Sequence, residues 1–460
     1  MSINFNAFEI GRRALTANQL GIDITGQNIA NVNTPGYSRR SLHLAEVASA
    51  SGSRFSIGAG VSIQGIQAYR DSFIESRIQQ EIGIAGYLSA RRDALIPVET
   101  ALHGSAGADI QSAFADFFGA FRDLEANPDS VPLRATVAGR GQNLADTFHS
   151  TYSRLEEIRS GTDAQFRASV EEVNSLSERI ATLNIEIRKV ENSGGQADAL
   201  RDQRNEFVNQ IAELTGARTT VNSDFTINVT IGEGRSLVTG DTFNALTISN
   251  TPPSGLAVAE FKGEPAIFNE GVLKGFNSAV SDISDNLAAL DGLAEQVAAR
   301  VNSLHTSGTD LDGNAGIDFF DQSSPVTASN ITINPLIAAN ARLVVASPIA
   351  QPAEHGTVAG QIAGLLTDTG TVVGSRTGSF SSIYGSLISD AGEQVRVAQD
   401  GLQTQAAIIA QATAQREAIS GVSLDEEAIN LLQYQKAFEA AARFIRVADE
   451  VTQTILSLAG

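Results

Sequence analysis

Cysteine and tryptophan are both absent from the 460 residues of this chain. Without cysteine the chain has no disulfide, no thiolate nucleophile and no cysteine-ligated zinc. This fits a protein that leaves a reducing cytoplasm and refolds outside it. Aromatic residues make up only 6% of the chain, so the core must rely on alanine, leucine, isoleucine and valine. Such a composition favours long packed helices over a β-sandwich.

Positive charge is scarce as well. Lys and Arg number 32 against 52 Asp and Glu, which gives a formal net charge of -20. An acidic chain repels nucleic acid and anionic lipid, so we expect neither nucleic acid nor membrane as a partner. No apolar stretch is long enough for a membrane span. The start, MSINFNAFEIGRRALTANQL, lacks a basic segment before an apolar run, so we expect a cytosolic protein or one exported without a cleaved signal peptide.

Catalytic patterns are missing too. The five histidines lie apart, and neither HExxH nor G-x-S-x-G occurs. We therefore expect no enzyme and no cofactor. His305 lies in LHTSG at an expected helix end, where a histidine can interact favourably with the helix dipole.

One acidic stretch resembles a calcium loop in its spacing. DLDGNAGIDFFD (310–321) offers several oxygen donors. However, Ala315 stands where the loop needs glycine, and Asp321 replaces the bidentate glutamate. We therefore predict a turn capped by Asp and Asn side chains, and no metal site.

Both ends of the chain carry the pattern of an amphipathic helix. Over residues 3–31 two neighbouring apolar stripes repeat every seven residues, and GQNIANVNTPGYSRR (26–40) then ends the helix, since proline cannot continue it. The last forty residues show a similar stripe at alternating steps of four and three. Such a helix needs an apolar partner. The N-terminal helix is the obvious candidate, and neighbouring subunits could cover the rest of these wide faces. The alternative is two ordinary helices of a globular core.

Between the ends, the period changes several times. Residues 41–70 are extended, and helices follow from 71 to about 160 with breaks at LHGSAG and ANPDSVP. Residues 163–216 predict an antiparallel helical hairpin. Alternation in FTINVTI predicts a small β unit.

The predicted fold is mainly α, with a terminal coiled coil, a long helical bundle core and small inserted β regions. The terminal coiled coil comprises residues 1–65 with 421–460, and the helical core comprises 66–216 with 265–305 and 371–420. The β unit covers residues 217–264, and a mixed outer region covers 306–370.

The terminal segments resemble a known family. GQNIANVNTPGYSRR (26–40) and GVSLDEEAINLLQYQKAFEAAARFIRVADEVTQTILSL (421–458) are similar to the two end signatures of the flagellar axial proteins, which build the rod, hook and hook-associated parts of bacterial flagella. In that family the terminal helices pair as a coiled coil on the inside of a tube. The Asn-rich stop would then mark where the inner helix ends and the chain crosses outward.

The middle of the chain resembles the hook-associated branch of the family, at the hook–filament junction. The segments that show this resemblance are ALRDQRNEFVNQIAEL (199–214), GRSLVTGDT (234–242) and LAEQVAARVNSLHTSGTDLDGNAGIDFF (293–320). A rod, hook or other hook-associated protein is the alternative within the family. One departure concerns Phe438 and Ala441–Ala442, which stand where the family tends to have Tyr and Asn.

The resemblance implies an extracellular structural subunit of the flagellum, exported through the growing structure by type III export and assembled along its axis. Expected partners are further copies in a ring, the hook protein, the second hook–filament junction protein and an export chaperone at the C-terminal region. The predicted assembly residues are Phe8, Leu15, Ile22, Ile24, Asn28, Ile29, Asn31, Asn33, Pro35, Gly36, Tyr37, Leu431, Tyr434, Phe438, Ile445, Val451, Ile455 and Leu458.

Two further hypotheses concern the same residues. Arg12-Arg13 and Arg39-Arg40 are positive spots in an acidic chain, which are either solvated surface or partners of an acidic neighbouring subunit. A helical signalling coiled coil is the alternative for the whole chain. It requires long uninterrupted heptads, which the β unit and the Asn-rich stop contradict.

Overall fold

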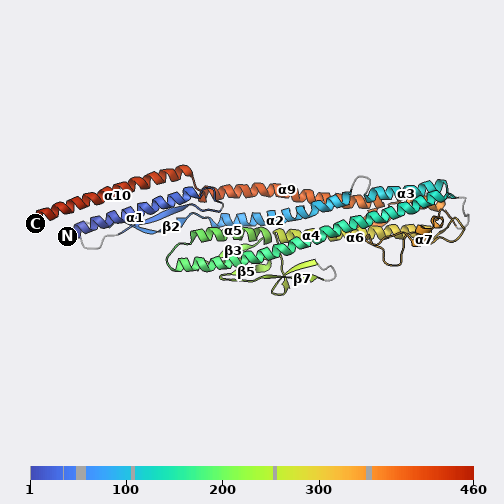
Figure 1. Cartoon of the computed structure of the whole chain (residues 1–460), viewed down its shortest axis with the longest axis horizontal. Coiled ribbons are helices and arrows are strands. Elements are labelled where there is room, and N and C mark those ends of the chain that lie inside the picture. The colour runs from blue at the N-terminus through green and yellow to red at the C-terminus, as the bar shows by residue number, and fades with distance from the viewer. Residues whose placement is uncertain are drawn as a thin grey trace.

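The computed structural model is elongated and has both chain ends at one extremity (Figure 1). It describes residues 2–34, 36–47, 58–104, 109–251, 256–348 and 355–459. The helices of this part of the chain are α1 (Ser2–Ala30), α2 (Ser72–His103), α3 (Ile110–Ala126), α4 (Val131–Asn192), α5 (Asp198–Thr215), α6 (Val272–His305), α7 (Pro335–Ala339), α8 (Thr357–Gly364), α9 (Phe380–Ser420) and α10 (Leu424–Ala459), with 3-10 turns at Gly232–Gly234 and Ala341–Leu343.

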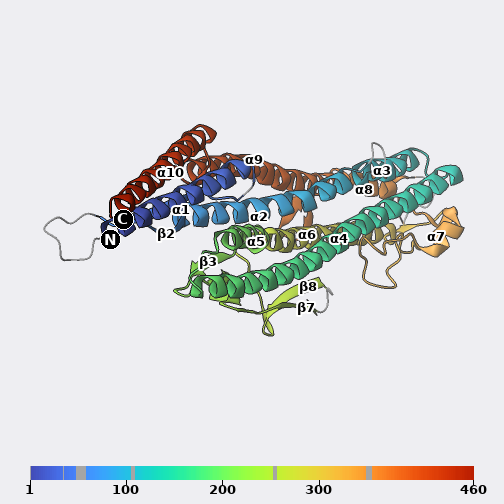
Figure 2. The same ribbon diagram turned by 60° about the vertical axis from the view of Figure 1, so that its left-hand side comes forward.

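The strands form small antiparallel sheets, and the two largest lie together beside α4 (Figure 2). In the described residues the strands are β1 (Arg40–Glu46), β2 (Val61–Ala68), β3 (Arg218–Val221), β4 (Ile227–Ile231), β5 (Arg235–Thr239), β6 (Thr242–Phe243), β7 (Leu246–Thr251), β8 (Leu256–Phe261), β9 (Glu264–Pro265), β10 (Gly308–Thr309), β11 (Ser347–Pro348), β12 (Thr371–Val373) and β13 (Arg376–Gly378). The sheet orders are β3-β4-β5-β6 and β7-β8-β9, with β1-β2, β10-β11 and β12-β13 as pairs. The predicted mainly α fold with small β insertions is confirmed.

Helix α4 corrects one predicted boundary. The sequence pattern placed a helix end near residue 160, but α4 runs without a break for 62 residues, a length of about 93 Å. The helix continues because buried side chains lie on both sides of Gly161, with Leu155 packed in one core and Phe166 in the next. Figure 1 shows α4 passing along much of the molecule.

Short polar side chains start the core helices. Asp71 accepts hydrogen bonds from the N–H groups of Phe73 and Ile74 at the start of α2, and Asp109 does the same for Ser112 in α3. These caps satisfy N–H groups that have no partner inside the helix. Ser130 caps α4 in the same way, by accepting from the N–H of Leu133, so the breaks predicted before α3 and α4 have a local cause in the sequence.

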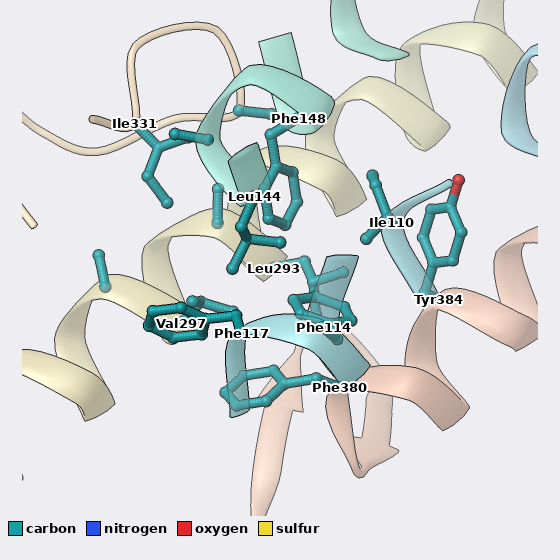
Figure 3. Packing of buried hydrophobic residues seen from close by; sticks show 14 of the residues in the cluster. Ile110, Phe114, Phe117, Leu144, Phe148, Leu293, Val297, Ile331, Phe380 and Tyr384 are labelled. Carbon is teal, nitrogen blue, oxygen red and sulfur yellow. The ribbon is translucent and has the colours of Figure 1, made fainter. Parts of the chain in front are cut away.

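A phenylalanine cluster lies where α3, α4, α6 and α9 meet (Figure 3). The rings of Phe117 and Phe121 meet edge to face with centroids 5.3 Å apart, and those of Phe118 and Phe380 stack at 5.8 Å. Many of the few aromatic residues in the chain are thus concentrated in one core. A second core joins α4, α5 and α6 to the β3–β9 sheets. The division of the chain into the predicted parts remains a proposal.

The helix end at His305 differs from its prediction. The imidazole is fully buried, where its Nδ1 contacts the carbonyl oxygen of Ile317 and its Nε2 accepts a hydrogen bond from the N–H of Val345, 2.9 Å away. The pKa of His305 is lowered to about 4, chiefly by burial; the hydrogen bond to Ile317 raises the pKa and the charge of Arg134 lowers it, both by less. The side chain is neutral at pH 7, so the predicted interaction of a charged His305 with the helix dipole is wrong.

The Asp-rich turn after α6 is present as predicted. The Oδ1 of Asp310 accepts hydrogen bonds from the N–H groups of Asp312 and Asn314, at 2.9 and 2.8 Å. Asp312 in turn pairs with Arg342. Within the described ranges no group of three or more His, Cys, Asp or Glu side chains could hold a metal ion. Across those same ranges, no helix combines the length and the apolar character that a membrane crossing needs.

Replacing Phe117 by alanine should lower the free energy of unfolding of the helical core by about 3–5 kcal/mol, because it leaves a cavity among four neighbouring rings. Denaturant unfolding of the full chain measures this. Phe73→Ala is the matched control, since that ring is 75% exposed, and its midpoint should hardly move. Equal losses for both variants would contradict the assignment of the core.

His305 should make the core sensitive to acid. Its pKa is lowered from 6.5 to about 4 on folding, so its contribution to stability is complete above about pH 6.5. That contribution is lost as the pH falls from 6.5 to 4, by about 3 kcal/mol at 1.36 kcal/mol per pKa unit. In urea unfolding at pH 7 and pH 4.5, His305→Gln should show a smaller difference between the two pH values than the parent chain. His43→Gln, at an exposed position of β1, should leave the difference as it is.

Candidate functional site

The first and last helices lie side by side and antiparallel (Figures 1 and 2). Gly11 of α1 meets the side chains of Phe444 and Ile445, and Gly21 faces the ring of Tyr434. A Cβ added at Gly21 would lie 2.6 Å from that ring. Gly11 and Gly21 therefore leave room for bulky side chains of α10, and this fit fixes the register of the pair.

The predicted apolar residues along this pair are either buried or half-buried between the two helices, or exposed near the end of α10. Ile24 is buried, and the other predicted apolar residues of α1 are half-buried, namely Phe8, Leu15, Ile22 and Ile29. On α10 the half-buried ones are Leu431, Tyr434, Phe438 and Ile445. Val451 and Ile455 are about half exposed, at 48% and 50%. The side chain of Leu458 and the whole of Pro35 lie outside the described residues.

One helix of the pair keeps an apolar surface. The exposed large apolar side chains of α10 are Leu424, Ile429, Leu432, Phe444, Val447, Val451, Ile455 and Leu456. At about 100° per residue all of them except Leu424 and Leu456 fall on one side of the helix, and we call the whole set the α10 apolar face. On α1, over residues 6–30, the exposed side chains are polar or small. Among the described residues α10 packs mainly on α1, and a single copy of the chain leaves the α10 apolar face about half exposed.

The Asn-rich stop forms a tight elbow after α1. Asn31 donates from its side chain to the carbonyl of Gln27 at 2.9 Å and accepts from the hydroxyl of Thr34 at 3.1 Å. Gly36 has a φ of +77°, a conformation that disfavours a side chain. Asn33 is exposed. These residues turn the chain back along α1 as β1.

Asn28 is the centre of a buried polar network at this elbow. It is 1% exposed, and its side-chain nitrogen donates to Glu427 at 3.0 Å and to the carbonyl of Arg40 at 2.9 Å. Its oxygen accepts from the Tyr37 hydroxyl at 2.8 Å. Arg39 donates to the other oxygen of Glu427 at 2.8 Å. The network joins the start of α10, the end of α1 and the start of β1, and we call it the elbow network.

The charges in the elbow network are compensated within it. Glu427 is 2% exposed and carries Arg39 and Asn28 as partners. Burial raises the pKa of Tyr37 above its ordinary value, so the hydroxyl keeps the proton that it donates to Asn28. The guanidinium of Arg40 lies over the Tyr37 ring, 5.0 Å from its centroid. Removing one member would leave a buried polar group without its partner.

The acidic partners of the paired arginines belong to this same chain. Arg39 binds Glu426 and Glu427, and Arg40 binds Asp202 of α5. Arg39 and Arg40 are thus not simply solvated surface, and their carboxylate partners in this structure lie within the chain itself. Arg12 and Arg13 pair with Glu9 one turn before them.

Sequence reasoning missed Glu427 and Asp202. Glu427 is one of three acidic residues in the first turn of α10, where acidic side chains are common because they favour the helix dipole. Nothing in the pattern distinguishes the buried one. Beside the elbow, a cavity of about 620 Å³ is lined by Asn31, Asn33, Gly36 and Tyr37 together with the α9–α10 connection.

Comparisons with known proteins agree with this architecture. A family model described as the helical domain of the flagellar hook-associated protein FlgK matches residues 95–320. A model of the C-terminal part of the flagellar basal body rod proteins FlgEFG matches residues 414–458, and one of the flagella basal body rod protein matches residues 8–37. The chain ends thus match models of rod proteins, and the middle matches a hook-associated one.

Whole proteins match over nearly their full length. Flagellar hook-associated protein 1 of Bacillus subtilis is 26% identical over 99% of this chain and 99% of its own. The protein of the same name from Escherichia coli K12 is 24% identical over 96% of this chain and 98% of its own. The flagellar hook junction protein FlgK from Burkholderia pseudomallei superposes with a TM-score of 0.63 at 15% identity, over 75% of this chain and all of that one. This last likeness concerns the fold.

Gly21→Ala should loosen the pairing of α1 with α10. The new methyl group would lie 2.6 Å from the Tyr434 ring, so the helices must move apart although alanine favours a helix by about 1 kcal/mol. Hydrogen exchange of the full chain should show faster exchange in α1 and α10. Gly26→Ala is the matched control because nothing lies within 4 Å of its added Cβ, and it should slow exchange. Slower exchange in both variants would contradict the packing role of Gly21.

Proposed function

This chain belongs to the FlgK family of flagellar hook-associated proteins, and from that premise we propose that its α1–α10 pair is the part that assembles with neighbouring subunits. The protein is a structural subunit of the bacterial flagellum at the junction of hook and filament. The observation that carries the assembly proposal is the α10 apolar face, which α1 leaves uncovered.

Burial of this face would stabilise an assembly considerably. Full burial of a large apolar side chain contributes about 1.5–3 kcal/mol. The members of the α10 apolar face are between 44% and 63% exposed, so covering each one contributes on the order of 1 kcal/mol. The face extends along a helix of 36 residues, about 54 Å long. Such a long apolar surface supports a neighbouring helix as its partner rather than a small ligand.

The neighbouring helices would come from further copies and from the adjoining hook and second junction proteins. A ring of identical subunits uses two different surfaces of each copy, so the α10 apolar face would meet another part of the next copy. Before export, the same face would be covered by a type III export chaperone at the C-terminal region. The protein would leave the cell through the growing flagellum and act there without enzymatic activity.

The assembly residues follow from this arrangement. Ile24, Tyr434 and Ile445 and their half-buried neighbours would hold α1 and α10 together, while Val451, Ile455 and the rest of the α10 apolar face would contact other subunits. Asn28 and Tyr37 would maintain the elbow. The polar tip of the elbow at Asn31, Asn33 and Gly36 would lie beside the core of the same or the next subunit.

A clean deletion in the source bacterium tests the junction role directly. Electron microscopy should find hooks without filaments, and flagellin should be shed into the medium. The intact gene supplied in trans should restore filaments and swimming. Loss of the hooks as well would place the protein lower in the axis, and normal filaments would overturn the junction role.

Val451→Glu should abolish filament attachment in the deletion strain, because it puts a charge into an apolar surface that neighbours must cover. The free chain should keep its unfolding midpoint, since Val451 is 48% exposed. Val372→Glu is the matched control: this valine of β12 is 53% exposed, and β12 packs on α6 of the helical core. Filament counts per hook measure the result. Equal attachment by both variants would contradict the role of the α10 apolar face.

A further inference from the structure

The geometry points to Asp202 of α5 as the residue that sets the direction in which the α1–α10 pair leaves the helical core. Two arginines converge on its carboxylate, Arg40 at the start of β1 and Arg70 just after β2. This inference rests on the proposed assembly role of the α1–α10 pair and adds what orients that pair.

The terminal unit is connected to the core by little polypeptide. It consists of α1, the β1–β2 hairpin and α10, which pack on one another. The chain passes between this unit and the core at residues 69–71, before α2, and at residues 421–423, between α9 and α10. Each connection is only three residues long. Two short connections act as a hinge unless side chains fix the angle between the two bodies.

The β1–β2 hairpin runs along α1 as a strut. At its base, Arg40 is opposite Ala68 in the strand register and its carbonyl binds Asn28 near the end of α1. At its other end, Gly60 lies against Ile10, and Arg13 reaches the carbonyl of Ala59. The hairpin therefore follows α1 over most of its length. Any force that holds the base of the hairpin also holds the direction of α1.

Asp202 holds this base from the core side. Arg40 Nη2 lies 2.8 Å from Asp202 Oδ2, and Arg70 contacts Asp202 Oδ1. The Asp202 side chain is 14% exposed, so water screens these ion pairs little and the charge-assisted bonds are strong. Arg70 also donates to the Ser38 hydroxyl at 3.0 Å, which links the same guanidinium to the elbow. A single carboxylate thus fastens both strands of the hairpin to α5.

A second polar contact also joins the hairpin to the core. Gln196, in the turn between α4 and α5, accepts a hydrogen bond from the N–H of Ile66 at 2.6 Å. A Cβ built at Gly65 would touch the Gln196 side chain. A cavity of about 430 Å³ lies between the hairpin and this turn and is lined by His43, Arg70 and Asp198 among others. The hairpin is therefore held to the core by polar contacts, at Asp202 and at Gln196, beside this cavity.

In this arrangement, loss of the carboxylate frees the hinge without altering the α10 apolar face. The two guanidinium groups would repel each other at the base of the hairpin. The α1–α10 pair would then take a range of directions, and copies in a ring could not present their faces to one another in register. Asp202 is thus a positioning residue for assembly.

The test uses engineered cysteines in the full chain, which has none of its own. Gly65→Cys and Gln196→Cys together follow docking of the hairpin, because the end of the Gln196 side chain reaches Gly65 and a short bifunctional maleimide can therefore join the two thiols within one subunit, which changes the mobility of the chain on a denaturing gel. The purified full chain, free of other subunits, provides the protein. The parent double-cysteine chain should cross-link. Added Asp202→Asn should lower the cross-linked fraction several-fold, and Asp202→Glu should restore it.

Asp282→Asn is the matched control, because Asp282 is a carboxylate of similar exposure, 19%, paired with Arg91 inside the core. It should leave the cross-link unchanged. Calorimetry of the free chains should show the same core transition for the parent and the Asp202→Asn chain, which separates docking from folding of α5. Filaments per hook should fall with Asp202→Asn in the chain without cysteines.

The role of Asp202 and the junction role can fail separately. No cross-link in the parent, or an equal cross-link with and without Asp202, would overturn the inference and leave the junction role intact. A lost cross-link with normal filament numbers would show that the direction is not needed for assembly, and would also overturn it. Failure of the junction role itself would appear separately, as normal filaments in the deletion strain.

Discussion

The pairing of the first helix with the last is the constraint on which the rest of this structure depends. It brings both ends of a 460-residue chain to one extremity, so everything between them must leave and return at the elbow. The core helices α2 and α9, which lie against each other, are the direct continuation of this pair. The pair itself is held by shape, since glycines of α1 accept Ile445 and Tyr434 of α10. Shape fixes the register but leaves most of the apolar surface of α10 free for other chains.

Much of the fold could be predicted because its signals are local. Seven-residue stripes indicated the terminal helices, the breaks at LHGSAG and ANPDSVP indicated where α2 and α3 end, and strict alternation indicated the β unit. The helix end predicted near residue 160 was wrong because Ser160 and Gly161 are weak breaks, and packing on both sides outweighs them. His305 was misread for a similar reason: the sequence shows a histidine at a helix end, and only the packing of Ile317 and Val345 against it shows that it is buried and neutral.

The candidate site also has one part that the sequence predicts and one part that it does not. Its apolar part follows from periodicity, which states which residues share a face. Its polar part does not, because Asn28 meets Glu427 across 399 positions of the chain and Arg40 meets Asp202 across 162. No local pattern distinguishes these carboxylates from the other acidic residues of an acidic chain. Such partners can be identified only when the elements that carry them have been placed.

The two kinds of contact suit two different tasks. Apolar contacts within the α1–α10 pair tolerate sliding and are continued by the same kind of contact between chains, so they can serve both the fold and the assembly. Charge-assisted bonds at the elbow and at Asp202 depend strongly on distance and direction. They are therefore suited to hold an angle between two bodies joined by short connections. The assembly proposed above would use both, because terminal helices that meet neighbours along a common axis would need apolar contacts, and a core held at a fixed position outside them would need a fixed angle.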